Sequence, residues 1–443
     1  MMSKKIGMFV WNHFTNDARV LRECTALAEK GYDVRLIAIH DSKQKDLKKN
    51  ENRNGFNIVR VSRYPKYILL INKVISLIKR NKILAIPLLT LIGLIFYFNQ
   101  AIGLAVLLFM GIMSLKKVRG FLIKAHIFLG MIIEGLKFNA DVYHSNDLNT
   151  LPQGIICSKI FRRRYLVYDS HEVQSSRTGY GKQAYYIEKI LIKFIDKMIM
   201  TNRTRAEYVK DLYNIDLPEI VHNYPFYTKD DSIENKYDLY GMLDIPRDKP
   251  ILLYQGGIQV GRGLDKIVEA IDKFNDGITV FIGDGKLKPE IIKMVDERNL
   301  NDKVRFLNKV PVDELKYYTA NAYLGFQVLN NVCFNHYSAC SNKLFEYMMS
   351  KVPVVACNFP EIKRVVQEEQ IGLVVDSHDP NEIANAVNIL LENKELHSMF
   401  SENCTKAREK YNWNNEKENF VKIYDSFLYK KNMNIDNDIN IGV

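Results

Sequence analysis

The chain has 443 residues, of which 47% are hydrophobic and 26% are charged, and its formal net charge is +11. This length exceeds one compact core and predicts two domains. The high apolar fraction and the scattered glycines exclude a disordered, collagen-like or small disulfide-linked protein. The six cysteines form no CxxC pair, which indicates reduced thiols in a cytosolic setting and no zinc site.

Strands and helices alternate along the first half of the chain, which predicts a parallel sheet covered by helices. A short apolar run at 6–11 is too brief for a signal peptide and predicts a first strand. In the polar loop that follows, Thr15, Asn16 or Asp17 can cap a helix over 18–30. The other predicted strands are 33–39, 56–61, 141–144, 165–168, 198–201 and 219–222, and the other predicted helices are 151–161 and 185–195.

Residues 66–139 interrupt this alternation and contain ten Lys or Arg against one acid, Glu134. Within them, 83–115 carry no charged side chain, a length typical of a membrane-embedded segment. Asn99 and Gln100 divide this stretch into two arms, each shorter than the roughly 20 residues of a full span. We therefore expect a helical hairpin that inserts into the bilayer. An unusually apolar helical layer buried in protein is the alternative.

The cations at both ends of this stretch predict that both ends lie on the cytoplasmic side of the membrane. The strands on either side of 66–139 must join one sheet, so the chain between them crosses the membrane an even number of times or not at all. Cations spread over a groove, or interleaved with stacking aromatics, are absent, so we expect no nucleic-acid partner. The sequence predicts a protein held at the cytoplasmic face by the hairpin around 83–115.

The second half repeats the alternation after a polar linker at 224–248. We expect two Rossmann-like lobes facing a cleft, at 1–223 and 249–412, a helix at 413–430 that crosses back to the first lobe, and a flexible tail at 431–443. The predicted strands of the second lobe are 251–254, 278–282, 304–307, 324–328, 354–356 and 372–375, and the predicted helices are 263–274, 289–298, 314–320, 343–349, 361–368 and 381–392.

Two glycine-rich loops follow successive strands of the second lobe. Gly256 and Gly257 open a loop that lets the backbone approach a phosphate, and Arg262 can pair with a diphosphate. Gly283 and Asp284 follow the next strand, and such carboxyl ends line ligand crevices in parallel sheets. An ordinary structural turn is the alternative for each loop.

A third element spans 341–348. Ser341 or Asn342 can cap a helix there, and Glu346 lies about one turn further along. A carboxylate in this place can accept hydrogen bonds from the vicinal hydroxyls of a ribose. The alternative is a solvated glutamate on a surface helix.

The order of these motifs, followed by 353–355 and 372–375, resembles the family 4 retaining glycosyltransferases of GT-B fold. In the first half, 16–23, 31–34, 144–147 and 168–172 are similar to the same family, so the resemblance covers nearly the whole chain apart from the insertion and the tail. The resemblance implies sugar transfer from a nucleotide diphosphate sugar to an acceptor hydroxyl with retention. It implies no metal and no cofactor beyond the nucleotide sugar as co-substrate.

The resemblance also implies roles for single residues. Arg262 matches the cation that holds the donor diphosphate, Glu346 the ribose-binding second Glu of E-x7-E, and His171 an active-site histidine. The remaining donor candidates are Gly256, Gly257, Gly283, Asp284, Asn342, Lys343 and Leu344. The acceptor-side candidates are Asn16, Asp17, His144, Asp147 and Glu172. With the hairpin, the resemblance favours a lipid-linked or cell-envelope glycan acceptor and polysaccharide biosynthesis, with membrane lipid as a further partner.

Two positions depart from the family pattern. Gly257 stands where the family usually has Arg, and Ser338 stands at the first Glu of E-x7-E. We hypothesise that Lys343, at the helix start, supplies the missing charge. The departures also motivate a second hypothesis, a catalytically silent glycosyltransferase-like subunit that anchors or stabilises a partner enzyme. An epimerase or phosphorylase with the same two-lobe architecture is a third.

Overall fold

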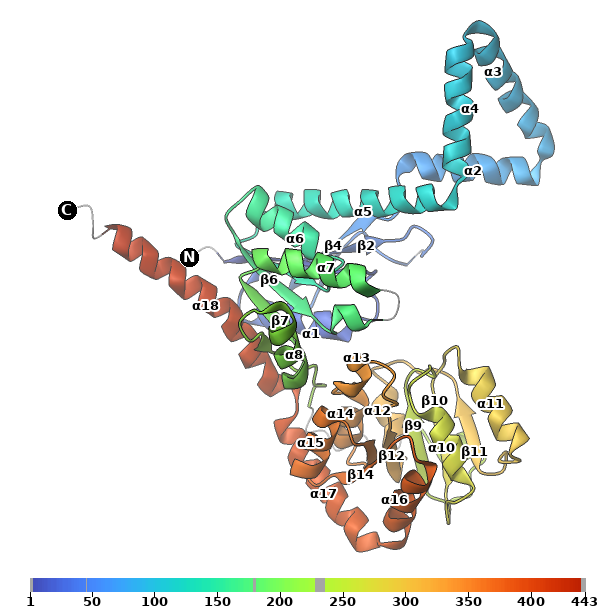
Figure 1. Ribbon diagram of the computed structural model, residues 1–443, viewed down its shortest axis with the longest axis vertical. Coiled ribbons are helices and arrows are strands. Elements are labelled where there is room, and N and C mark those ends of the chain that lie inside the picture. Colours follow the sequence, from blue (N-terminus) through green and yellow to red (C-terminus); the bar gives the residue numbers. More distant parts are fainter. Residues whose placement is uncertain (1–2, 45, 178–180, 228–235, 440–443) are drawn as a thin grey trace. The chain divides into compact units, whose positions relative to one another are not determined.

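The computed structural model describes residues 3–44, 46–177, 181–227 and 236–439. The chain divides into two compact units, Met1–Asp169 with Leu191–Lys197, and Ser170–Ile190 with Met198–Val443. Its strands form two sheets (Figure 1). These units do not coincide with the two predicted lobes, and the predicted limits at residues 223 and 249 stay predictions.

The first sheet has the strand order β3-β4-β2-β1-β5-β6-β7-β8. β1 pairs in parallel with β2 and β5, whereas the short edge strand β3 runs antiparallel to β4. All five residues of β5 are buried, including the polar His144, Ser145 and Asn146 at its carboxyl end. The strands are β1 Lys5–Phe9, β2 Asp33–His40, β3 Asn50–Arg53, β4 Phe56–Ser62, β5 Val142–Asn146, β6 Tyr165–Ser170, β7 Lys197–Met200 and β8 Glu219–Ile220.

The first helix, α1 (Ala18–Glu29), begins where the polar loop predicts. Asp17 is its N-cap and accepts a hydrogen bond from the backbone N of Val20 at 3.2 Å. The predicted helix at 151–161 is shorter than expected, because α6 (Leu151–Ile155) gives way to a π-helical turn at Ile156–Ile160. β4 and β5 belong to one sheet, which confirms the topological premise about the insertion between them.

Four helices fill the insertion: α2 (Lys66–Arg80), α3 (Ala85–Phe98), α4 (Gln100–Ser114) and α5 (Lys116–Phe138). The chain breaks at Asn99, whose side chain caps α4 by accepting from the backbone N of Ile102 at 3.1 Å. α3 and α4 pack side by side as a hairpin (Figure 1). A Cβ on Gly103 would lie 2.6 Å from the Cα of Phe96, so this glycine allows the close approach of the two helices.

Within the described part of the chain, no helix alone has both the length and the apolar character needed to cross a bilayer; α4 and α5 together meet that criterion, but they are bent by 83°.

The predicted insertion extends too far toward its C-terminal end. From Ile127 on, α5 buries Ile127, Met131, Ile132 and Phe138 and packs against β2 and β4. These side chains recur at helical spacing on one face, so this half of α5 is a covering helix of the sheet. The part that projects from the sheet therefore ends well before residue 139.

The second sheet has six strands in the order β11-β10-β9-β12-β13-β14, and every pair is parallel, as predicted. Apolar clusters fill both of its faces. Its strands are β9 Ile251–Gln255, β10 Ile278–Ile282, β11 Val304–Leu307, β12 Leu324–Gln327, β13 Val354–Cys357 and β14 Gly372–Val375. Its helices are α10 Leu264–Ile271, α11 Lys288–Glu297, α12 Leu315–Thr319, α13 Phe334–Tyr337, α14 Asn342–Met349, α15 Pro360–Glu368, α16 Pro380–Glu392 and α17 Lys394–Lys410.

Three further helices complete the second unit: α7 (Gly181–Leu191), α8 (Arg203–Tyr213) and α9 (Leu239–Met242). The last helix, α18 (Trp413–Ile439), continues past the predicted end at residue 430, since no Gly or Pro interrupts it. Glu416 of α18 accepts a hydrogen bond from the backbone N of His222 at 2.7 Å. This contact ties α18 to the segment that follows β8.

Candidate functional site

The two glycine-rich loops of the second sheet lie against each other. Gly256 follows β9 and Gly283 follows β10, and the backbone N of Ile258 donates to the carbonyl of Asp284 at 3.0 Å. A Cβ on Gly283, at a φ of 152°, would lie 1.9 Å from the carbonyl oxygen of Gly256. Only glycine fits there, and the loops meet through their backbones at the carboxyl edge of the sheet.

Asp284 holds its own loop in place. Its carboxylate accepts from the backbone N of Lys309 at 2.9 Å and from Nζ of Lys288 at 3.0 Å. These hydrogen bonds lower the pKa of Asp284, so the carboxylate is ionised at neutral pH. The structure therefore gives Asp284 a role in holding its loop. Its contact with a nucleotide stays a prediction.

Lys343 lies against the loop that contains Gly257. It sits in the first turn of α14 with 6% of its surface exposed, and its Nζ is 4.1 Å from the centre of the Tyr254 ring. No hydrogen-bond partner for Nζ exists among the described residues. Burial, followed by the charge of Arg262, lowers the pKa of Lys343 from 10.5 to about 7. This amine is therefore buried, without a hydrogen-bond partner among the described residues, and only partly protonated at neutral pH.

Helix α14 is fixed to the sheet by Tyr347. Its hydroxyl donates to the carbonyl of Leu253 at 2.9 Å and accepts from the backbone N of Gln255 at 3.2 Å. The carboxylate of the preceding residue, Glu346, accepts from Nε2 of Gln255 at 2.9 Å. The start of α14 and the Glu346 carboxylate are thereby held at the end of β9, beside the first glycine loop.

A pocket of about 270 Å³ lies in the second unit. Four of the predicted site residues form part of its wall: His171, Glu172, Arg262 and Asn342. Gly256, Gly257, Gly283, Asp284, Lys343, Leu344 and Glu346 lie outside the wall; the Leu344 side chain is buried in the apolar core, which leaves its backbone for any ligand contact. The other wall residues are Thr201, Arg205, His222, Asn223, Tyr224, Asn335, His336, Ala339, Cys340, Ser341 and Phe345.

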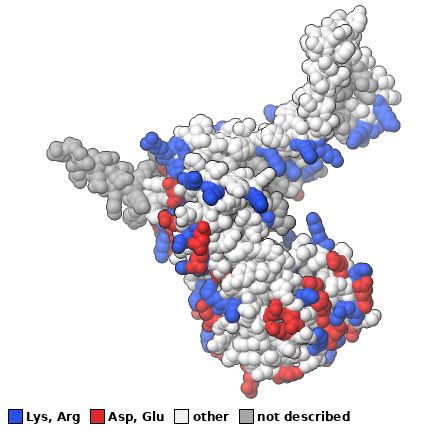
Figure 2. Space-filling view, in the orientation of Figure 1, with Lys and Arg blue, Asp and Glu red and all other residues white. Residues whose placement is uncertain are grey.

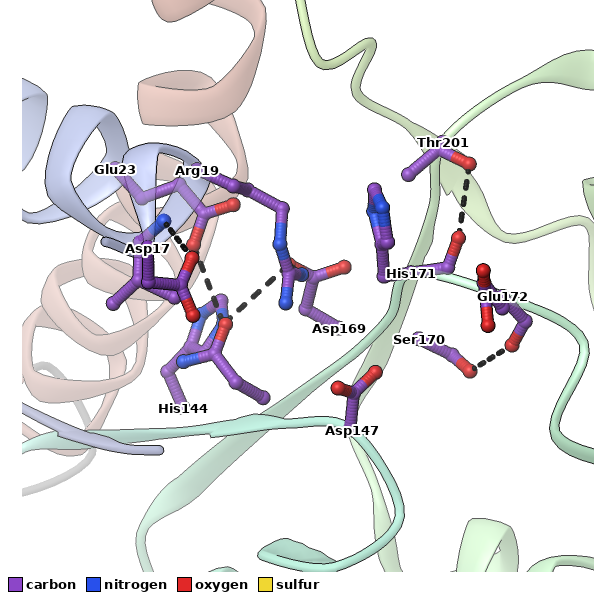
Figure 3. Close-up of polar contacts among 12 residues, drawn as sticks. Asp17, Arg19, Glu23, His144, Asp147, Asp169, Ser170, His171, Glu172 and Thr201 are labelled. Atoms are coloured by element: carbon purple, nitrogen blue, oxygen red, sulfur yellow. Dashed lines mark hydrogen bonds and ion pairs between the residues drawn. The ribbon is translucent and has the colours of Figure 1, made fainter. Parts of the chain in front are cut away.

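The backbone of His171 is held from two sides. Thr201 Oγ1 donates to the His171 carbonyl at 3.2 Å, as drawn in Figure 3, and Arg205 Nη1 donates to the same oxygen at 2.7 Å. Ser170 Oγ donates to the carbonyl of Glu172 at 2.9 Å. The end of β6 is thus shaped into a fixed turn that presents His171 and Glu172 to the pocket.

The first unit holds a separate buried cluster at the start of α1 and the ends of β5 and β6 (Figure 3). Arg19 forms an ion pair with Asp169, and Nε2 of His144 lies 3.8 Å from Glu23 and 3.9 Å from Asp169. Burial and the nearby Arg19 lower the pKa of His144 to about 3, so its ring is neutral. Burial and the Asp169 charge raise the pKa of Glu23 well above its usual range.

Within the described residues, Glu23, His144 and Asp169 are the one group whose ligand atoms lie close enough together, within 4.8 Å, to hold a metal ion. The Arg19 guanidinium already pairs with Asp169 and supplies the positive charge that this cluster needs. The arrangement fits a structural ion-pair network, and we assign no metal to it.

The acceptor-side candidates are spread over both units. Asp147 follows β5 with a positive φ of 61°, Asn16 is exposed, and Asp17 caps α1. His144 is fully buried, which favours a positioning role over direct contact with an acceptor. Of the five, Glu172 lines the pocket of the second unit.

Several wall residues had no sequence signal. Arg205 lies in α8, an 11-residue helix whose mostly charged and polar sequence gives only a weak helix signal. Its partners Asn335 and Ser338 are more than 100 positions away along the chain, so spacing does not connect them. His336 lies in the short helix α13, and burial lowers its pKa.

Residues 241–407 match the family model described as "Glycosyl transferases group 1". The Alpha-D-kanosaminyltransferase of Streptomyces kanamyceticus is 27% identical over 161 residues, which are 35% of this chain and 40% of that protein. The chain spans about half the length of the curated relatives that it matches.

Solved structures resemble nearly the whole chain. Sucrose-phosphate synthase from Thermosynechococcus elongatus superposes with a TM-score of 0.70 at 17% identity, over 96% of this chain and all of that one (100%). Anabaena HepE in complex with UDP-glucose superposes with a TM-score of 0.66 at 13% identity, over 95% of this chain and 99% of that one. These likenesses establish the GT-B fold, which confirms the two-lobe α/β part of the expected fold class; the insertion of the hairpin into a membrane stays a prediction.

Proposed function

We propose that the protein is a family 4 retaining glycosyltransferase that moves a sugar from a UDP- or GDP-sugar to a hydroxyl of a lipid-linked or cell-envelope glycan. The observation that carries the proposal is the pocket lined by Arg262 and by Asn342 at the start of α14. Two glycine loops and the buried Lys343 lie beside it. Together they offer cations, backbone N–H groups and the positive end of a helix dipole to a diphosphate.

In this proposal, named residues bind the diphosphate and the ribose of the nucleotide-sugar donor. The diphosphate takes Arg262, the Lys343 amine and the first N–H groups of α14, so Lys343 supplies the charge missing at Gly257. The ribose hydroxyls donate to Glu346, which is oriented by Gln255. The matching family and the UDP-glucose complex of a structural neighbour support a nucleotide-sugar donor.

The transfer breaks the bond between the anomeric carbon and the diphosphate oxygen and forms one from the same face to the acceptor oxygen. The leaving diphosphate gains negative charge, which the preorganised cations and the helix dipole stabilise. The acceptor hydroxyl gives its proton to the departing phosphate oxygen, so no side-chain nucleophile and no metal are required. His171, held in the pocket wall, lies beside the sugar in this proposal.

The α3–α4 hairpin supports a place at the cytoplasmic membrane face. It exposes large apolar side chains, among them Leu94, Leu108 and Phe109, each at least half exposed. Figure 2 shows this hairpin free of charged side chains, with Lys and Arg gathered at its base. Exposed apolar patches of this kind mark contact surfaces, and flanking cations attract anionic lipid headgroups.

The proposal is tested by donor turnover. Membranes carrying the protein are given a panel of UDP-, GDP- and other nucleotide sugars with envelope lipid extract. Nucleotide release from one donor, lost in Arg262→Ala and Glu346→Ala but kept in the exposed control Glu290→Ala, is the expected result. No release from any donor would refute the enzyme assignment and favour the catalytically silent subunit.

The membrane part is tested separately by flotation. Replacing residues 85–114 with a short Gly/Ser linker removes the hairpin and leaves the sheet-covering half of α5 intact. The shortened protein should leave the lipid fraction and still bind nucleotide. If it floats with vesicles as the full chain does, the hairpin is not the anchor.

A further inference from the structure

Arg205 is a buried cation in the pocket wall that forms no direct ion pair among the described residues, although the charges of Glu172 and Glu361 act on it from nearby. The side chain is 6% exposed, and its guanidinium forms four hydrogen bonds, all to uncharged acceptors. The acceptors are the His171 carbonyl at 2.7 Å, Thr201 Oγ1 at 2.9 Å, the Asn335 carbonyl at 2.9 Å and Ser338 Oγ at 3.2 Å. A guanidinium has five N–H donors, so one, on Nη2, remains without an acceptor among the described residues.

The nearest carboxylates are already paired with other cations. Glu172 lies 3.3 Å from Arg177, and Glu361 lies 3.2 Å from Arg364. Among the described residues, Arg205 itself takes part in no ion pair. Burial accordingly lowers the pKa of Arg205. Burying an unpaired charge is costly, and proteins keep such a group where a ligand or a mechanism uses it.

The pocket wall holds two arginines and one carboxylate, Glu172, which is paired with Arg177. Arg262 lies in the same wall, and burial together with Arg262 lowers the pKa of His336, which keeps that ring neutral. His222 is occupied by Glu416 at 3.0 Å. In the proposed reaction Arg262 binds the donor diphosphate, so Arg205 is a second positive charge that the diphosphate does not use. Arg205 contacts the backbone of His171, beside which the sugar lies in that reaction.

Resting on the proposed function, we propose that the substrate sugar is anionic, and that Arg205 binds the carboxylate of a hexuronic acid in this pocket. The one remaining N–H group of the guanidinium can donate a single charge-assisted hydrogen bond to a carboxylate oxygen. Arg205 Nε donates to the uncharged hydroxyl of Ser338. A carboxylate at position 338 would form an ion pair with Arg205, so the serine leaves the arginine charge for the substrate.

The carboxylate can belong to the donor sugar or to the acceptor sugar, and the experiment separates the two. One arm compares binding of UDP-glucuronate with UDP-glucose. The second arm, at saturating UDP, compares oligosaccharides that end in a uronic acid with their neutral counterparts. The wild-type protein should prefer the anionic member in one arm by about 10- to 100-fold, the range for a hydrogen bond to a charged group.

Two variants test Arg205 by different routes. Arg205→Gln removes the charge, and Ser338→Asp keeps the arginine but gives it an internal carboxylate. Both should bring the anionic-to-neutral ratio close to one, whereas Arg203→Gln, at an exposed position on the same helix, should leave it unchanged. A merely structural Arg205 would weaken both members equally and keep the ratio.

The outcomes distinguish failure of the anionic subsite from failure of the proposed glycosyltransferase function. Equal affinity for anionic and neutral members in both arms, or a preference that survives both variants, would overturn the anionic subsite and leave the glycosyltransferase assignment standing. Failure to bind UDP, GDP or any of their sugars would overturn the proposed function itself, and the subsite with it.

Discussion

Replacing Lys343 by Met should stabilise the ligand-free protein. The substitution keeps the length of the side chain, which is 6% exposed against Tyr254, and removes an amine without a hydrogen-bond partner among the described residues. The pKa of Lys343 falls from 10.5 to about 7 on folding. Between these values the unfolded chain binds more protons than the folded one, so the folding penalty of the wild-type protein decreases as the pH rises.

The magnitude follows from one pKa unit corresponding to about 1.4 kcal/mol. The penalty is about 4 kcal/mol at pH 7 and about 2 kcal/mol at pH 9, less roughly 0.5 to 2 kcal/mol for the lost contact with the Tyr254 ring. Lys343→Met should therefore raise the melting temperature at pH 7 and lose much of that advantage by pH 9. Its affinity for UDP should fall, because the diphosphate loses a cation.

Thermal melts of both proteins from pH 6.5 to 9.5 measure the effect, with exposed Lys286→Met as the matched control. Other titrating groups act in both proteins and cancel in the difference between them. A difference that stays constant with pH, or a variant less stable than wild type throughout, would refute the reasoning about the buried amine.

Three further substitutions test the packing of the sites. Gly283→Ala should lower the free energy of unfolding by about 2 to 4 kcal/mol and weaken nucleotide binding, since its Cβ would meet the Gly256 carbonyl. Gly120→Ala, whose Cβ would have nothing within 4 Å, should be neutral or stabilising. Thermal melts and UDP titrations compare the two variants. Arg19→Met should cost about 3 to 5 kcal/mol by leaving Asp169 unpaired beside Glu23, and a melting temperature equal to that of exposed Arg203→Met would contradict this. Glu416→Ala should cost about 1 to 3 kcal/mol by removing the acceptor of His222, visible as increased proteolysis of α18 if that helix detaches.

Local sequence patterns predict most of the strands and helices of the two sheets. The apolar runs bounded by turn residues predict β10 and β11 to the residue, and Asp17 and Asn99 cap the helices that they precede. These features depend on neighbours in sequence, which is why they can be read without a structure. The sequence does not predict α8 and β3, because α8 has few apolar residues among its charges and β3 is a four-residue strand of polar residues.

The site was only partly predictable for the same reason. Local composition predicts the glycine loops and α14. The pocket wall around Arg205, in contrast, is assembled from segments more than 100 positions apart, which no local pattern connects. The extent of the insertion was misjudged because α5 changes role along its length: its first part carries the cations, and the part from Ile127 on covers the sheet. Burial, which distinguishes these halves, is not a local property of the sequence.

The central claim is that the second unit binds a nucleoside diphosphate through Arg262 and Glu346. Equilibrium titration of the full-length protein with UDP and with GDP tests this without knowledge of the sugar or the acceptor. The account predicts saturable binding of one of the two, weakened at least about tenfold in both Arg262→Ala and Glu346→Ala and unchanged in Glu290→Ala. Binding of neither nucleotide, or equal binding by wild type and both variants, would contradict it.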